Sequence, residues 1–137
     1  MNNKSKFFSI LLLVLVLSCA KNPFTGKRTI ALVPNSQIFP SSFQQYNQFL
    51  SENKVITGTA DANRIETIGM KIKTASERWL NANGHSEYLQ GYEWEYKLVA
   101  SKEVNAWCMP GGKIVFYSGI LPICKDDPGI AAVMGHE

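Results

Sequence analysis

The sequence has little of several features that would point to a particular class of protein. It has three cysteines and no C-x-x-C pair, so the usual spacing of a cysteine-rich zinc site is absent. Of its 14 basic residues, two lie in the first 18 positions. The rest of the chain is close to neutral, which excludes an electrostatic case for nucleic-acid binding. The longest apolar run, Phe7 to Leu17, is about half as long as a membrane-spanning helix requires. No internal repeat or low-complexity tract is present.

The overall composition is that of an ordinary globular chain. Hydrophobic residues make up 45% of the 137 positions and charged residues 18%, enough for one domain with a modest core. The predicted organisation is a signal peptide over 1–18, a tether over 19–35 and a folded domain over 36–137.

The N-terminus, "MNNKSKFFSILLLVLVLSCAKN", has the three parts of a secretory signal: a basic start, a short apolar centre and a small residue at the cleavage point. The stretch "VLSC" resembles the lipobox of bacterial lipoproteins, which implies that Cys19 becomes the first, diacylated residue. Acyl chains hold a soluble domain at a membrane by burying methylene groups. Ala20 favours the outer membrane over the inner one, so we expect a periplasm-facing, lipid-anchored envelope protein. The alternative is a plain signal peptide with a coincidental cysteine.

The two remaining cysteines, Cys108 and Cys124, would then face an oxidising compartment. They could form a disulfide, or they could be two small buried residues, the more common use of free cysteine. A zinc site that uses both has poor support, because the expected ligand spacing is missing.

The apolar periodicity predicts an α+β fold of helices, then strands, then a helix. A short helix after Ser41 or Ser42 and a longer one over Asp61–Asn81 each present one apolar face. The apolar positions of the longer helix are Ile65, Ile68, Ile72, Ala75 and Trp79.

The segment "YEWEYKLVAS" alternates like a strand. Two apolar runs around Pro110-Gly111-Gly112 then predict a hairpin in a small antiparallel sheet. Asp127 and Pro128 mark the start of the last helix, and His85 is interpreted as a solvated loop residue.

The last two residues, His136 and Glu137, follow this apolar helical segment. Zinc hydrolases place two histidines four residues apart on one helix, so that both imidazoles reach one metal. The glutamate after the first histidine acts as the general base toward the metal-bound water. A histidine and a glutamate alone are not a specific motif. Without further context, a polar helix end favoured by the helix dipole is the better explanation of the two residues.

That context is the stretch "VNAWCMPGGKIVFYSGILPICKDDPGIAAVMGHE" together with "NPFTGKR". It resembles the membrane-associated zinc metallopeptidases related to HtpX and the CAAX prenyl protease, in particular their secreted lipoprotein branch. The resemblance implies a zincin-like catalytic domain that binds one Zn²⁺, with His136 as a metal ligand and Glu137 as the catalytic base. It also implies that Asn105 and Ala106 belong to an edge strand that pairs with the backbone of a peptide substrate.

Two elements of that family are absent from these 137 residues: the second histidine, expected at position 140, and a later glutamate ligand. Catalytic zinc needs three protein ligands, so we expect the 137 residues alone to be an inactive N-terminal fragment of a metalloendopeptidase. Its substrates would be misfolded or misassembled envelope proteins. The alternative is a non-catalytic envelope lipoprotein that serves as a binding or scaffold module.

Overall fold

The computed structural model describes residues 19–30 and 33–137, which divide into two compact units, one that ends at Pro34 and one that runs from Asn35 to Glu137. The predicted signal peptide therefore lies outside the described residues. In the first unit, β1 (Cys19–Lys21) and β2 (Arg28–Ile30) form an antiparallel hairpin where the sequence had indicated an extended tether. The reason is local: the side chain of Asn22 accepts hydrogen bonds from the backbone of Phe24 and Thr25 and so fixes a turn.

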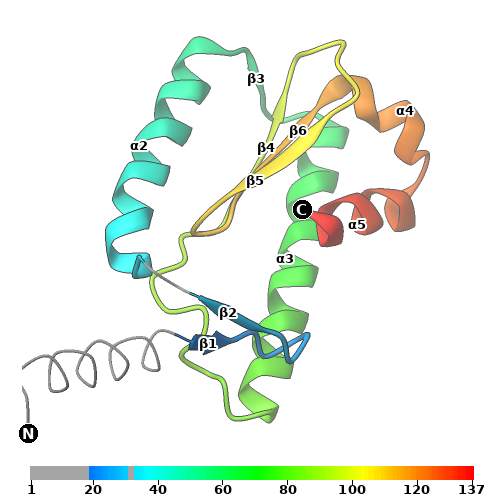
Figure 1. Ribbon diagram of the computed structural model, residues 1–137. Coiled ribbons are helices and arrows are strands. Elements are labelled where there is room, and N and C mark those ends of the chain that lie inside the picture. Colours follow the sequence, from blue (N-terminus) through cyan, green and yellow to red (C-terminus); the bar gives the residue numbers. More distant parts are fainter. Residues whose placement is uncertain (1–18, 31–32) are drawn as a thin grey trace, which may run out of the picture. The chain divides into compact units, whose positions relative to one another are not determined.

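The second unit contains helices and a four-stranded sheet (Figure 1). Its elements are α2 (Asn35–Glu52), β3 (Val55–Ile56), α3 (Ala60–Ala82), β4 (Glu95–Val99), β5 (Ala106–Met109), β6 (Lys113–Tyr117), the 3-10 turn η1 (Ser118–Ile120), α4 (Leu121–Cys124) and α5 (Asp127–His136). This mixture of helices and a small sheet agrees with the predicted α+β class.

The sheet is mixed, so the expectation of a purely antiparallel sheet was wrong. Its strand order is β3-β4-β6-β5, and β4 runs parallel to β6 while the other two pairs are antiparallel. The predicted hairpin of β5 and β6 exists, but β6 inserts between β4 and β5. The strand that follows β4 in sequence is therefore displaced to the edge of the sheet.

Helices cover both faces of the sheet. On one face, α2 packs Tyr46 against Val99 and Val115, with Phe49 and Leu50 at the border of this cluster. On the other face, α3 and α5 join the strands in a larger buried cluster, and Figure 1 shows α2 and these two helices on opposite sides of the strands. The members of the larger cluster are Ile65, Ile68, Leu98, Ala106, Ile114, Phe116, Ile120, Cys124, Ile130 and Met134. Burial on both faces explains why β6 is apolar at nearly every position.

Several helix boundaries differ from those expected. Helix α2 begins at Asn35, ahead of the serines proposed as its cap, and Ser42 is buried inside it. The cap of α3 is Thr59, whose hydroxyl accepts from the backbone of Ala62 at 3.2 Å, and Asp61 lies in the first turn. At the far end of α3 the buried residue is Leu80, and Trp79 is 40% exposed. In each case the apolar face was recognised and its exact limits were not.

The turn between β5 and β6 is held tightly between other elements. Gly111 and Gly112 have φ of 91° and 85°, a conformation that glycine adopts without strain. A Cβ on either glycine would also overlap an aromatic ring, that of Phe43 for Gly111 and that of Trp94 for Gly112. Ser42 donates a hydrogen bond from its hydroxyl to the carbonyl oxygen of Pro110 at 2.7 Å. The turn therefore fixes β5 relative to α2.

Candidate active site

Local contacts fix the start of helix α5, and one side of this helix is buried. Its cap is Asp126, one residue before the position expected from the sequence; the carboxylate accepts from the backbone of Gly129 at 2.9 Å. Gly129 has no space for a Cβ, because the carbonyl oxygen of Cys124 occupies that position. Asp127 pairs with Arg64 of α3. These contacts at its start hold α5 against α3, and Ile130 and Met134 anchor it to the core.

His136 is the last residue of α5 and Glu137 follows it as the C-cap. Both residues are exposed, and neither side chain forms a hydrogen bond or an ion pair with another residue that the structure describes. The backbone of Glu137 still donates to the carbonyl of Val133 at 3.2 Å, so helical geometry extends to the carboxylate. An imidazole and a carboxylate are thus exposed at consecutive positions of the helix end.

Strand β5 is an edge of the sheet among the described residues. Asn105 immediately precedes it, and its carbonyl accepts a hydrogen bond from the backbone of Tyr117 at 3.1 Å. Hydrogen-bonded pairs alternate along antiparallel strands, so Asn105 and Trp107 direct their backbone groups toward β6. The N–H and C=O groups of Ala106 and Cys108 consequently face away from the sheet, toward the open edge.

Helix α5 and the edge strand contribute to one buried cluster, which includes Ala106 of β5 and Ile130 and Met134 of α5. The side chains of Ala106 and Cys108 lie on the face that α5 covers, since strand residues two apart share a face. Partial burial, and then the nearby negative charge of Glu137, raise the pKa of the Cys108 thiol. The alternation of residues in β5, together with the apolar sequence of α5, was the sequence signal for this packing. That signal could be interpreted only once the pairing partner of β5 was known.

The same face holds a hydroxyl without a partner. The Tyr96 hydroxyl is buried and has no hydrogen-bond partner among the described residues. Its ring stacks on Trp94 and lies over Gly69 of α3, where a Cβ would overlap it. Burial, then the charges of Glu77 and Cys108, raise the pKa of Tyr96 to about 12. This phenol therefore stays protonated at neutral pH and can donate a hydrogen bond beside the thiol.

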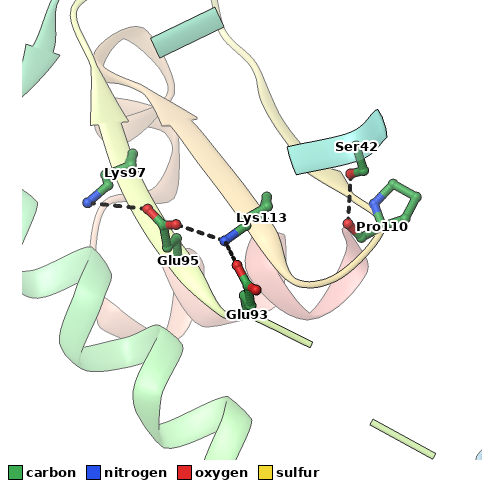
Figure 2. A network of polar contacts seen from close by, with 6 residues as sticks. All are labelled: Ser42, Glu93, Glu95, Lys97, Pro110 and Lys113. Carbon is green, nitrogen blue, oxygen red and sulfur yellow. Dashed lines mark hydrogen bonds and ion pairs between the residues drawn. The ribbon is translucent and has the colours of Figure 1, made fainter. Parts of the chain in front are cut away.

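A buried ammonium group organises the opposite face of the sheet (Figure 2). Lys113 is only 3% exposed, and its Nζ lies 2.7 Å from Glu95 and 3.5 Å from Glu93. The same atom lies 4.5 Å from the centroid of the Phe43 ring and 5.6 Å from that of Tyr46. Lys113 also pairs in register with Met109, the last residue of β5. One cation thus joins α2, β4 and the hairpin that carries the edge strand.

The two cysteines are not paired with each other. Cys108 is exposed and Cys124 is buried, and both are free thiols. Cys124 is therefore a small buried residue, which is one of the two interpretations that the sequence left open. Cys108 lies instead at the candidate site.

The described residues do not by themselves make a complete zinc site. His136 supplies one nitrogen donor of the type that zinc prefers, but no group of three or more histidine, cysteine, aspartate or glutamate side chains is placed to hold a metal within residues 19–30 and 33–137. The described residues therefore offer a zinc ion one histidine ligand and a neighbouring carboxylate, and a catalytic ion would need further ligands.

Comparison with known proteins finds a family match in the C-terminal part of the chain. Residues 70–137 match the model of peptidase family M48. This segment is therefore similar to peptidase family M48. The match includes β4, the hairpin of β5 and β6, and α5, so all the candidate site residues except Cys19 fall within the M48 segment.

Individual relatives agree with this assignment. The chain is 41% identical over 76 residues to the mitochondrial metalloendopeptidase OMA1 of Saccharomyces cerevisiae, an alignment that covers 54% of this chain and 21% of that protein. It is 38% identical over 66 residues to OMA1 of Arabidopsis thaliana, with 48% and 14% covered. It is 38% identical over 56 residues to the metalloprotease LoiP of Escherichia coli, with 41% and 22% covered. The chain thus spans less than a quarter of the length of these relatives.

No helix of the described residues is long and apolar enough to cross a membrane.

Proposed function

We propose that this chain belongs to a zinc-dependent metalloendopeptidase in which His136 binds the metal and Glu137 acts as the general base. The observation that carries the proposal is the position of this pair, at the exposed end of a rigid helix beside an open edge strand, inside a segment that matches peptidase family M48. Bound zinc would lower the pKa of a coordinated water.

The edge strand supplies the second half of the proposal. The outward N–H and C=O groups of Ala106 and Cys108 can pair with an extended peptide, and such pairing tolerates many substrate sequences because main-chain groups make the hydrogen bonds. Asn105 lies one residue before the strand with an exposed side chain, in reach of a peptide that extends past its start. A strand bound at this edge would lie near α5, because Ala106 of β5 belongs to the same buried cluster as Met134 of α5.

The decisive experiment uses the full-length gene product and measures bound zinc by mass spectrometry together with hydrolysis of casein. We expect His136→Ala to lose zinc, and Glu137→Gln to retain zinc while losing nearly all hydrolysis. His85→Ala and Glu87→Gln are matched controls, because both residues are exposed in a loop, and they should leave zinc and activity unchanged. A wild-type protein without zinc, or an active Glu137→Gln variant, would favour the non-catalytic scaffold module.

We further propose that Cys19 carries the lipid anchor and that the protein faces the periplasm from a bacterial membrane, the outer one in preference to the inner. The lipobox-like stretch "VLSC" supports this location. The substrates would be misfolded or misassembled envelope proteins, since pairing through the main chain selects for an extended backbone more than for a sequence.

A further inference from the structure

The side chain of Trp107 forms a fixed aromatic wall at the open edge. Trp107 is the second residue of β5 and lies on the face covered by α2. Its ring centroid is 4.8 Å from that of Phe49 and 6.4 Å from that of Tyr46, both in edge-to-face geometry. Its Nε1 donates to the hydroxyl of Tyr117 at 3.3 Å. These partners contact the indole from α2 and from β6, yet Trp107 is only half-buried.

A peptide added to this edge would place one side chain directly against that wall. The added strand hydrogen-bonds to the outward groups of Ala106 and Cys108, so its intervening residue stands opposite Trp107 in a non-hydrogen-bonded pair. Side chains of opposite residues share a face and have Cβ atoms about 4.5–5.5 Å apart. The two flanking substrate residues project to the other face, where Ala106 is small.

The chemistry of the α2 face selects the kind of side chain. Near the edge this face presents Trp107, Phe49 and Met109. Lys113, which pairs in register with Met109, is 3% exposed and already paired with two carboxylates. The charge of Lys113 is therefore not available to a substrate residue, whereas the indole offers a flat apolar surface. Because its partners fix its orientation, little side-chain entropy is lost when it is contacted.

We propose that Trp107 is a specificity-determining residue that selects peptides with a large apolar side chain at the position opposite it. This inference rests on the proposed function, because it assumes that a substrate strand pairs with β5. Aromatic and aromatic–aliphatic contacts of this kind are expected to raise affinity about twofold to tenfold for phenylalanine over serine at that position.

The test uses the full-length Glu137→Gln protein and fluorescent ten-residue peptides that contain no other aromatic residue. A photoreactive benzoylphenylalanine is moved along the peptide to find the position that crosslinks to the tryptic fragment containing Trp107. Binding is then measured with phenylalanine, leucine, serine or aspartate at that position. We expect the Phe-to-Ser preference to disappear in Trp107→Gln, to remain in Trp107→Phe, and to be unchanged in Trp79→Gln, a matched control at another partly exposed tryptophan.

The outcomes separate this inference from the proposed function. If the active enzyme hydrolyses casein but Trp107→Gln keeps the full Phe-to-Ser preference, the specificity role is refuted and the peptidase assignment stands. A crosslink only to fragments outside β5 likewise refutes it. If Trp107→Gln does not fold, the crosslink position and the Phe-to-Ser preference of the Glu137→Gln protein without a change at Trp107 still decide. Peptides that bind without preference in the wild type would also overturn the inference.

Discussion

Replacement of the buried ammonium of Lys113 by an apolar group of similar shape is expected to destabilise the domain, because the ion pairs and cation–π contacts of this group are lost. In Lys113→Met the methylene stem is largely retained, so the change removes the charge and its partners. A hydrogen bond between charged groups contributes about 1.5–3 kcal/mol and a cation–π contact about 0.5–1 kcal/mol. The contact with Glu93 adds little, because that side chain is 67% exposed.

The carboxylate that remains is partly accessible to water. The Glu95 side chain is 38% exposed, so it regains part of its hydration when Lys113 is lost and the cost stays below that of a fully buried broken pair. We therefore expect Lys113→Met to lower the free energy of unfolding by about 2–3 kcal/mol. Glu95→Gln, which keeps an acceptor oxygen, should cost about 1–2 kcal/mol. Removal of both charges together should cost less than the sum, because no unpaired charge is left.

Equilibrium urea unfolding, followed by far-UV circular dichroism, measures all four proteins of this double-mutant cycle. With an m value of about 1–3 kcal/mol per molar urea, Lys113→Met should shift the midpoint by about 1 M. Glu87→Gln is the control, because it removes a carboxylate from an exposed loop. Additive effects of the two substitutions, or a change below about 0.5 kcal/mol for Lys113→Met, would show that the ammonium does not hold these elements together.

Three further outcomes are expected. Gly69→Ala should destabilise the domain by about 1–3 kcal/mol, because the new methyl overlaps the phenol ring of Tyr96. Gly135→Ala, with open space around it, should be neutral or stabilising in the same urea-unfolding assay. In the metal-free chain at pH 8, Cys108 should react with iodoacetamide more slowly than a free thiol, because a raised pKa lowers the thiolate fraction; Glu137→Gln should accelerate the reaction, and an unchanged rate would mean that the carboxylate is not nearby. Cys19→Ala should abolish labelling by radioactive palmitate and release the protein from the membrane fraction; retained label would refute the lipid anchor.

The sequence was sufficient where a pattern is local. The stripe that contains Ile65 and Ile68 predicted the buried face of α3, and the Pro110-Gly111-Gly112 turn predicted the hairpin, because both follow from spacing within a few residues. It was also sufficient for the final helix, apart from a one-residue error in the cap.

Features that depend on contacts between residues far apart in the sequence could not be predicted from the sequence. The parallel pairing of β4 with β6 is set by which strand inserts between two others, and no local pattern encodes that choice. Lys113 looks like a surface residue in the sequence and is buried only because Glu95 and Phe43 arrive from other elements. Likewise, the grouping of Ala106 with Ile130 and Met134 depends on how α5 packs against the sheet.

The insertion of β6 between β4 and β5 has a consequence for how the chain folds. The β5–β6 hairpin joins strands that are neighbours in sequence, so it can form within microseconds. Strand β4 instead pairs with β6, from which it is separated in sequence by the whole of β5. The slow event should therefore be the docking of β4 onto a preformed hairpin. Until it occurs, the apolar middle strand exposes an unsatisfied backbone edge, and during synthesis this interval is when the polypeptide is most prone to self-association.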